Sequence, residues 1–333
     1  MRGKRITVKL GSACNLHCKH CHVAEVAYKF NPDVIAFLRK EGPERITFCG
    51  GEPTLYMDVI KKIVEALPES MQYKLVTNGT TLTYDLTDYF NKHKFRVIIS
   101  YDGETSSRDR SLMQAWDEYA VINQGGVSTL FSPENADILR FSNQLELLRQ
   151  RYMPRAVGAS IWVNFPHQTE VNHNDSVSRD LAVRYCQVMA VALEGDFLRL
   201  KHGQKHNLSA LGMAFHKWLE TSSGRGVKCC NDDVLNVTLD GRFLLCPYGT
   251  EFVGDIYNGV DWDAVESHIP ERCKSCPLWD VCRNTCIANI TTNECYISRV
   301  MYRHILKLMG KYRVSYEDLE DTFRIKGGEI LCW

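Results

Sequence analysis

Short runs of apolar, often β-branched residues recur along the first 200 residues, and stretches with helical spacing separate them. Runs of the first kind predict strands, and apolar residues recurring every three to four positions predict helices. The expected strands are Ile6–Leu10, Arg45–Cys49, Tyr73–Thr77, Arg96–Ser100, Val127–Phe131 and Ala159–Asn164. The expected helices are Asp33–Lys40, Val59–Leu67, Tyr84–Lys92, Leu112–Val121, Glu134–Arg151 and Val177–Leu193.

Six successive β–α units predict an α/β fold in which a parallel sheet is covered by helices. We expect a partial (β/α)6 barrel of the TIM type, whose chemistry lies at the C-terminal ends of the strands. From Lys201 the pattern changes to a helix over Leu208–Thr221, a hairpin over Val234–Leu245 that turns at Asp240-Gly241, and a cysteine-rich stretch. A further helix is expected over Val300–Met309.

These patterns predict four segments of the chain. The partial barrel covers residues 1–200, and a bridging helical segment covers 201–228. A small cysteine-rich domain follows over 229–310, and a charged tail covers 311–333.

The composition narrows the class of protein. The 333 residues are 44% hydrophobic and 24% charged, which is typical of a globular chain of one large or two smaller domains. Forty basic residues balance forty acidic ones, so no net charge favours nucleic acid or a membrane as a partner. Because neither a signal-peptide core nor a membrane-length apolar run is present, we expect a cytoplasmic protein. In that reducing compartment its fourteen cysteines are expected to be metal ligands rather than the disulfides of a secreted protein.

Three cysteines share one short stretch, GSACNLHCKHCH, after the first expected strand. Cys14, Cys18 and Cys21 have the spacing C-x3-C-x2-C. Three thiolates can hold three irons of a 4Fe–4S cube and leave the fourth iron open for chemistry. The spacing alone also fits a zinc knuckle, or three unrelated thiols.

Glycine-containing polar segments follow the next three strands: Gly50-Gly51-Glu52-Pro53, Thr77-Asn78-Gly79-Thr80 and Ser100-Tyr101-Asp102-Gly103. Glycine lets a backbone approach a ligand closely, and a carboxylate can accept a hydrogen bond from an ammonium group. The second and third segments could also be ordinary turns, because Asn-Gly and Asp-Gly are turn formers. All three segments are expected at the same end of the barrel as the cysteines.

The cysteine spacing and the Gly-Gly-Glu-Pro segment together resemble the signature of the radical S-adenosylmethionine (radical SAM) enzymes. The resemblance implies that the three cysteines hold a SAM-cleaving 4Fe–4S cluster whose open iron binds the methionine part of SAM. It implies a SAM site in which Glu52 receives the amino group; the site comprises Gly50, Gly51, Glu52, Pro53, Asn78, Ser100 and Asp102. The sequence departs from the family at His20, where an aromatic residue is common, and at Arg108-Asp109, where a His-Asp pair is frequent.

The C-terminal cysteines form a second pattern, Cys230-x10-Gly241-x4-Cys246 followed by Cys273-x2-Cys276-x5-Cys282-x3-Cys286 and Cys295. Seven cysteines in this order resemble the SPASM domain of radical SAM enzymes that carry two auxiliary clusters. The resemblance implies one 4Fe–4S cluster on Cys273, Cys276, Cys282 and Cys295, and another on Cys230, Cys246 and Cys286. With the N-terminal cluster this makes three 4Fe–4S clusters; two structural zinc sites are the alternative.

The fourth ligand of the Cys230 cluster stays open. Family members that fully ligate this cluster have a cysteine about six residues earlier, where this chain has Ser223-Gly224. Either the neighbouring Cys229 serves, or the iron is open to a substrate. Cys49, Cys186 and Cys332 fit no motif, and helical spacing among apolar residues predicts that Cys186 lies in the core.

The resemblance implies that an electron from the first cluster cleaves SAM to methionine and a 5′-deoxyadenosyl radical, which removes hydrogen from the substrate. The base rate of the SPASM pattern favours a ribosomally made peptide or protein as substrate, and a crosslink, thioether or oxidation as outcome. A flavodoxin- or ferredoxin-type protein would supply the electron. Because the first cluster cysteine is residue 14, leader binding is expected to need a separate protein or another surface.

Three other functions fit parts of the sequence. A sulfatase-maturase-like enzyme would make formylglycine, but such enzymes have an aspartate base where this chain has Pro247. A small-molecule oxidase or epimerase is the second alternative, with Cys229 as the thiol to test as a hydrogen donor in epimerisation. A non-catalytic iron–sulfur protein for electron transfer or scaffolding is the third, and the open-iron triplet followed by Glu52 argues against it.

Overall fold

The computed structural model describes residues 4–18, 21, 23, 25–101, 116–131, 160–164, 179–204, 209–219, 225–227, 229–282 and 292–323. The helix predicted over Glu134–Arg151 and the residues after 323 lie outside these ranges.

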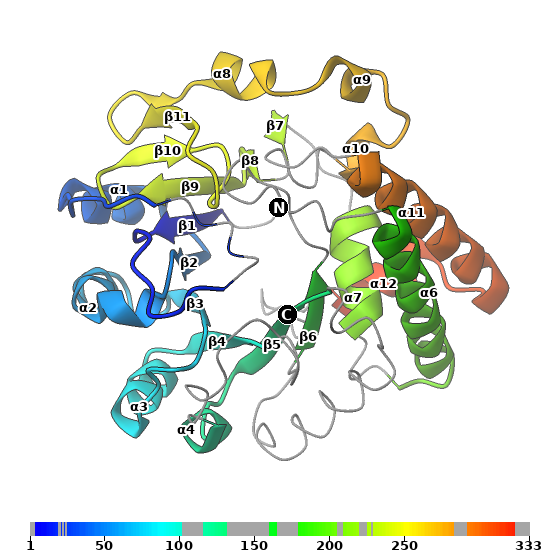
Figure 1. The fold of residues 1–333 in the computed structure, drawn as a ribbon, viewed down its shortest axis with the longest axis horizontal. Coiled ribbons are helices and arrows are strands. Elements are labelled where there is room, and N and C mark those ends of the chain that lie inside the picture. Colours follow the sequence, from blue (N-terminus) through cyan, green and yellow to red (C-terminus); the bar gives the residue numbers. More distant parts are fainter. Residues whose placement is uncertain are drawn as a thin grey trace.

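Parallel strands form the first part of the chain, in the order of the sequence. They are β1 (Arg5–Lys9), β2 (Arg45–Cys49), β3 (Gln72–Thr77), β4 (Phe95–Ser100), β5 (Gly125–Leu130) and β6 (Ser160–Asn164). The helices of this part are α1 (Asp33–Glu41), the 3-10 helix η1 (Pro53–Tyr56), α2 (Met57–Glu65), α3 (Tyr84–Lys92), α4 (Trp116–Ala120) and α6 (Arg179–Lys201). Figure 1 shows the strands arranged in an arc with α1 to α4 on its outer side. The predicted α/β fold with a partial, open barrel is confirmed.

Alternation along each strand separates the two faces of the sheet. Apolar residues such as Ile6, Ile46 and Leu75 are fully buried in a core that they share with Phe37 and Ile60 of the outer helices. Because successive side chains of a strand point to opposite faces, the intervening polar residues face the inside of the barrel. The outer face therefore stabilises the fold, and the inner face and the strand ends carry the polar chemistry.

The C-terminal strands continue the same sheet. They are β7 (Gly226–Val227), β8 (Cys230–Asn231), β9 (Val234–Thr238), β10 (Arg242–Leu244), β11 (Phe252–Asp255) and β12 (Gly259–Val260). Strand β9 pairs in parallel with β1, from Arg5 opposite Val234 to Lys9 opposite Thr238. Strands β9 and β10 form the predicted hairpin, in which Gly241 has a φ of +90° that a β-carbon would strain. The segment predicted as a separate domain from residue 229 thus shares its sheet with the barrel.

A second core lies beside the barrel. The helices of this region are α7 (Ser209–Ala214), the π-helix η4 (Phe215–Leu219), α11 (Thr292–Tyr312) and α12 (Tyr316–Phe323). Helix α11 lies along α6 (Figure 1), and Met189, Met301 and Ile305 are buried between them. The segment 311–323 was expected as part of a charged tail, but residues 316–323 are helical because Leu319 and Phe323 are buried in this core. Between β12 and α11 lie the short helices α8 (Trp262–Ser267), α9 (Glu271–Lys274) and α10 (Trp279–Cys282).

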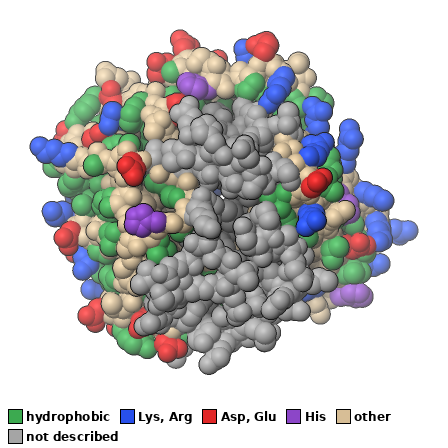
Figure 2. Space-filling model, viewed as in Figure 1, with side chains coloured by type: hydrophobic (Ala, Val, Ile, Leu, Met, Phe, Trp, Pro, Cys, Tyr) green, Lys and Arg blue, Asp and Glu red, His purple; other side chains and the backbone are tan. Residues whose placement is uncertain are grey.

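Two further differences from the predicted elements have local causes. Helix α2 begins at Met57 rather than Val59 because η1, opened by Pro53, leads directly into it. The helix expected over Leu208–Thr221 changes to π-helical geometry at Phe215. Acidic and basic side chains are interspersed around the rim of the face in Figure 2, as the charge balance suggests. Among the described helices, none is long and apolar enough to cross a membrane.

Candidate functional site

The N-terminal cysteine loop leaves the end of β1 and is fixed by backbone hydrogen bonds to the end of β2. Leu10 N donates to Cys49 O at 2.9 Å, and Gly51 N donates to Gly11 O at 2.9 Å. Glu52 N then donates to Ala13 O at 2.8 Å. The Gly-Gly-Glu-Pro segment and the cysteine loop therefore form one unit, although Cys14 and Gly51 are 37 positions apart in sequence.

Glycine is required where these two segments meet. A β-carbon on Gly51 would lie 2.3 Å from the carbonyl oxygens of Ser12 and Ala13, and one on Gly50 would lie 2.6 Å from Gly11 O. Both distances are far below van der Waals contact, and the neighbours are backbone atoms that cannot rotate away. The glycines were expected to admit a ligand, and the structure shows that they also admit the cysteine loop itself.

The three cysteines have graded exposure. Cys14 and Cys18 are half-buried, and Cys21 is exposed. Cys21 N donates to Cys18 O at 3.0 Å, which gives the loop a tight turn between these cysteines. Leu16 N donates to Cys14 Sγ at 3.4 Å, as backbone amides do around the sulfurs of iron–sulfur clusters.

Asn78 joins the cysteine loop to the end of β3. Its Nδ2 atom donates to Asn15 Oδ1 at 2.9 Å and approaches Cys14 Sγ at 3.9 Å. Its Oδ1 atom accepts hydrogen bonds from the backbone amide and the hydroxyl of Thr80, at 2.9 and 2.7 Å. Asn15 Nδ2 donates to Thr80 Oγ1 at 2.7 Å, which closes the network. The predicted SAM-site residue Asn78 is therefore beside the first cysteine.

Glu52 is fully buried and its carboxylate is extensively hydrogen-bonded. Oε1 accepts hydrogen bonds from the amide and hydroxyl of Thr54, at 3.1 and 2.6 Å, and from the hydroxyl of Thr77 at 2.6 Å. Oε2 accepts one from Asn78 N at 2.7 Å. The side chain thus ties the end of β2 to the end of β3; its predicted contact with the SAM amino group stays a prediction.

Two other predicted SAM-site residues, Pro53 and Ser100, lie at the same end of the sheet. Pro53 is buried and begins η1. Ser100 ends β4, where it stands opposite Ser128 of β5. Asp102, Arg108-Asp109, His20 and His22 lie outside the described residues.

Four C-terminal cysteines lie near one another in the structure, and their assignment to one auxiliary cluster stays a prediction. Burial raises the pKa of Cys273, and the neighbouring Cys295 and Cys282 raise it further. Burial likewise raises the pKa of Cys295, next to Cys282 and Cys276. Arg272 opposes both shifts, because its positive charge favours the thiolates and its side chain hydrogen-bonds to Cys273. The structure therefore brings Cys273, Cys276, Cys282 and Cys295 into one electrostatic neighbourhood.

The second predicted set is less complete. Burial raises the pKa of the Cys230 thiol to about 12, Cys246 is buried, and Cys229 is half-buried. Cys286 lies outside the described residues.

Two residues near Cys246 were not predicted as part of any site. Lys9 is only 1% exposed, and its Nζ donates to Gly249 O at 2.9 Å. Burial lowers the pKa of Lys9, while Cys49, Cys246 and Glu251 act in the opposite direction. Burial raises the pKa of Cys49 to about 12 despite the nearby Lys9 charge. A fully buried lysine almost always has a partner. The sequence signal for a structural role of Lys9 was its position as the last residue of the short strand β1.

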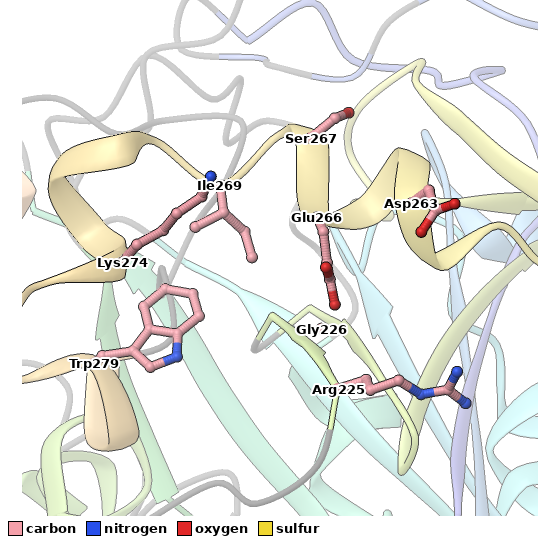
Figure 3. Close-up of a pocket in the computed structure, with 8 residues that line it drawn as sticks. All are labelled: Arg225, Gly226, Asp263, Glu266, Ser267, Ile269, Lys274 and Trp279. Carbon is pink, nitrogen blue, oxygen red and sulfur yellow. The ribbon is translucent and has the colours of Figure 1, made fainter.

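A cavity of about 530 Å³ lies between β7, α8 and α10, next to the four gathered cysteines. Figure 3 shows Trp279 and Ile269 on one side and the Glu266 carboxylate pointing inward. Its cations have partners: Lys274 forms an ion pair with Glu271 at 2.8 Å, and Arg225 stacks on Trp262 at 4.6 Å. None of its lining residues belongs to the cysteine loop or to the strand-end network, so it is a different region from the predicted SAM site.

The two cysteine groups fit the iron–sulfur clusters that the sequence implies. No disulfide joins the cysteines in the described part of the chain. Amide and guanidinium donors reach Cys14 and Cys273, as expected around thiolate ligands. No three acidic, histidine or cysteine side chains of the described residues are arranged to hold a single metal ion. A cube places each thiolate on a different iron, so its ligands need not converge in that way.

Comparisons with known proteins agree with this geometry. Residues 8–120 match the family described as the radical SAM superfamily. A probable GTP 3′,8-cyclase of Pyrococcus abyssi is 26% identical over 263 residues, covering 72% of this chain and 83% of that protein.

Two solved structures share the fold. The anSMEcpe protein with bound AdoMet and Cp18Cys peptide has a TM-score of 0.66 at 16% identity, covering 93% of this chain and 99% of that one. Streptococcus suis SuiB bound to precursor peptide SuiA has a TM-score of 0.57 at 13% identity, covering 86% of this chain and 72% of that one.

Proposed function

We propose that this chain, a member of the radical SAM superfamily through residues 8–120, is an enzyme that modifies a ribosomally made peptide or protein. When bound, the N-terminal cluster and SAM supply a 5′-deoxyadenosyl radical that abstracts hydrogen from the substrate. The observation that carries the proposal is the tied unit of the cysteine loop, Gly50-Gly51 and Asn78, which leaves Cys21 exposed.

The chain's own residues have defined tasks in this proposal. Cys14, Cys18 and Cys21 hold the cluster, and the exposed side of the loop leaves room for a small cofactor. Gly50 and Gly51 bring the β2 end against the loop, and Asn78 donates toward Cys14. Glu52 holds the two strand ends in register through its four hydrogen bonds. Rigid positioning of this kind is the main contribution that a protein makes to cofactor chemistry.

A peptide is the proposed substrate because both structures with the same fold, anSMEcpe and SuiB, were solved with a bound peptide. Formylglycine formation is disfavoured, since Pro247 follows Cys246 and cannot act as a base. We further propose two auxiliary clusters, a flavodoxin- or ferredoxin-type reductant, a cytoplasmic location, and a separate protein or surface for a leader peptide. In the Cys230 cluster, Cys229 or a substrate atom would complete the iron coordination.

The test is formation of 5′-deoxyadenosine by the reconstituted, dithionite-reduced protein with SAM, measured by chromatography. We expect product from the wild type and at least a 100-fold loss for Cys14→Ala. The matched control is Cys186→Ala, because Cys186 is a buried thiol of α6 that belongs to no motif; this variant should keep the activity. If the wild type forms no 5′-deoxyadenosine, or Cys14→Ala forms as much, the proposed function is wrong.

Iron content separates the cluster and zinc interpretations. Three clusters predict about twelve irons per chain. Cys14→Ala should lose about four of them, whereas stoichiometric zinc in the wild type would contradict the assignment.

A further inference from the structure

Ala13, the residue before the first cysteine of the loop, is hydrogen-bonded on both sides by the segment that follows β2. Its carbonyl oxygen accepts a hydrogen bond from Glu52 N at 2.8 Å. Its amide nitrogen donates to the hydroxyl of Tyr56 at 2.9 Å. Glu52 immediately precedes the short helix η1 and Tyr56 ends it. One turn of helix therefore supplies the partner of each polar backbone group of Ala13.

The position of Tyr56 is set by the barrel. Pro53 begins η1, and the Glu52 carboxylate accepts a hydrogen bond from Thr54 N, which fixes the first turn. The Tyr56 ring is half-buried and packs against the barrel core. Its hydroxyl therefore reaches the cysteine loop from a support that does not itself depend on the loop.

Gly11 leaves the space that this hydroxyl occupies. A β-carbon on Gly11 would lie 2.4 Å from the Tyr56 hydroxyl oxygen and 3.1 Å from the ring carbon that carries it. Gly11 also has a φ of +144°, which residues with a side chain rarely adopt. Gly11 and Tyr56 thus fit each other, although neither was predicted as a site residue.

The cysteine loop is closed just before Ala13. Ser12 N and Ser12 Oγ donate to Val26 O at 3.0 and 2.9 Å, and Val26 N donates to Ser12 Oγ at 2.9 Å. Only Ala13 lies between this closure and Cys14. Among the described residues, the hydrogen bonds to the Ala13 backbone come from Glu52 and Tyr56. These two bonds therefore set the direction in which the chain continues to Cys14.

We propose that Tyr56 is a positioning residue of the SAM-cleaving site, whose hydroxyl holds Ala13 and thereby sets the place of Cys14. The inference rests on the proposed function, because it gives Tyr56 a role in that site. A displacement of about 1 Å at a reacting centre can lower a rate about 100-fold. Ala13 is exposed, so water can replace a lost acceptor and the fold loses little stability. The hydroxyl thus contributes more to the rate than to the stability.

The test is Tyr56→Phe in the reconstituted full-length protein. We expect kcat for 5′-deoxyadenosine formation to fall about 10–100-fold. KM for SAM should change by less than about threefold, because Gly50, Gly51 and Asn78 stay in place. Iron content should stay full, and the unfolding midpoint should stay within about 2 °C. Hydrogen exchange of residues 11–16, followed by mass spectrometry, should show the Ala13 amide exchanging about tenfold faster.

Tyr119→Phe is the matched control. The Tyr119 hydroxyl also accepts a backbone hydrogen bond, from Gly126 N at 2.7 Å, but it is fully buried and does not contact the cysteine loop. Its loss should lower the unfolding midpoint by at least about 2 °C and leave kcat and the exchange of residues 11–16 unchanged. A Tyr56 hydroxyl with a merely structural role would give this same pattern.

A second pair of variants tests the contact itself. Gly11→Ala should displace the Tyr56 hydroxyl and lower kcat. In the Tyr56→Phe background the same substitution should cost at least about fivefold less, because the oxygen that it displaces is already absent. Equal costs in the two backgrounds would contradict the proposed role of this contact. If Gly11→Ala does not fold, the comparison of Tyr56→Phe with Tyr119→Phe decides alone.

The proposal is wrong if Tyr56→Phe keeps the wild-type kcat, or if residues 11–16 exchange at the wild-type rate in this variant. It is also wrong if kcat falls only in proportion to lost iron. A wild type that forms no 5′-deoxyadenosine would instead overturn the proposed function. The exchange measurement would still show whether Tyr56 holds the loop, so the two failures are distinguishable.

Discussion

The two cysteine regions of this protein are held in place by different forces. The N-terminal loop is half-exposed and is fixed by backbone hydrogen bonds, glycine contacts and the Asn78 amide. In the C-terminal region, Cys230, Cys246 and Cys273 are buried, and burial dominates the pKa shifts of Cys230 and Cys273. An exposed thiolate loop suits a cluster that must meet a cofactor and a substrate, whereas buried thiolates suit clusters that store or pass electrons.

The largest expected effect comes from the contact that places the N-terminal loop. In Gly51→Ala, the β-carbon would collide with two carbonyl oxygens at 2.3 Å, so the loop must move away from β2. We expect a loss of about 3 kcal/mol in unfolding free energy and near-complete loss of the N-terminal cluster. Chemical denaturation and iron content measure the two effects.

Gly195→Ala is the matched control for that substitution. Gly195 lies in α6 and has open space around its missing β-carbon. Alanine should stabilise this helix by about 0.5–1 kcal/mol. If Gly51→Ala and Gly195→Ala changed the unfolding free energy and the iron content equally, the close contact of Gly51 with the cysteine loop would not be what holds that loop in place.

Asn78→Ala tests whether the N-terminal cluster can stay bound while its activity falls. It removes the amide that donates to Asn15 and approaches Cys14, but leaves every cysteine in place. Loss of such an outer contact typically reduces the activity of a metal site about 10–100-fold. We expect that reduction in 5′-deoxyadenosine formation with nearly full iron content. Asn91→Ala, which removes an amide bonded to Val121 O at 2.8 Å, is the control and should keep the activity.

Lys9→Met tests the connection between the regions, because Lys9 ends β1 and donates to Gly249 of the Cys246 loop. Losing this buried hydrogen bond should lower the unfolding free energy by about 1–3 kcal/mol. Lys29→Met, at an exposed lysine, should change it by less than about 0.5 kcal/mol. An unfolding free energy for Lys9→Met that matches the Lys29→Met value would mean that the two regions are not joined through this side chain.

Asp196 gives a pH-dependent effect on stability in the second core, away from both cysteine regions. Burial raises its pKa to about 6, although Leu211 N and Arg199 donate to it at 2.9 Å. The folded state then binds more protons than the unfolded state between pH 4 and 6, so stability falls as pH rises through that window. The fall is at most about 3 kcal/mol, since one pKa unit corresponds to about 1.4 kcal/mol.

The measurement for Asp196 compares the wild type with Asp196→Asn at pH 5 and pH 7.5 by urea denaturation. The difference in unfolding free energy should shift in favour of the variant at the higher pH. A difference that stays constant between the two pH values would contradict the raised pKa.

The sequence predicted the elements whose signal is local. Strand β2 and helix α3 match their predicted bounds, because Arg45–Cys49 is bounded by turn residues and Thr83 caps α3 by accepting from Leu86 N. The resemblance to the SPASM pattern implied the grouping of the four C-terminal cysteines, which lie near one another in the structure. The pairing of β9 with β1 could not be predicted, since it joins residues more than 220 positions apart by backbone contacts that no motif specifies.

Side-chain roles were harder to predict than positions. Glu52 was predicted at the strand end, but its four protein donors depend on how β2 and β3 approach each other. The surroundings of the buried Lys9 arise from strand register, which is set by tertiary structure. A strand residue's face can be read from alternation, but its neighbours across the sheet cannot.

The most direct test of the account is ⁵⁷Fe Mössbauer spectroscopy of the reconstituted protein before and after addition of SAM. The account predicts that one iron per chain, the one without a cysteine ligand, changes its isomer shift when SAM binds, and that this change is absent in Cys14→Ala. Spectra that are identical with and without SAM would mean that the N-terminal cysteines leave no iron open, and would contradict the proposed chemistry.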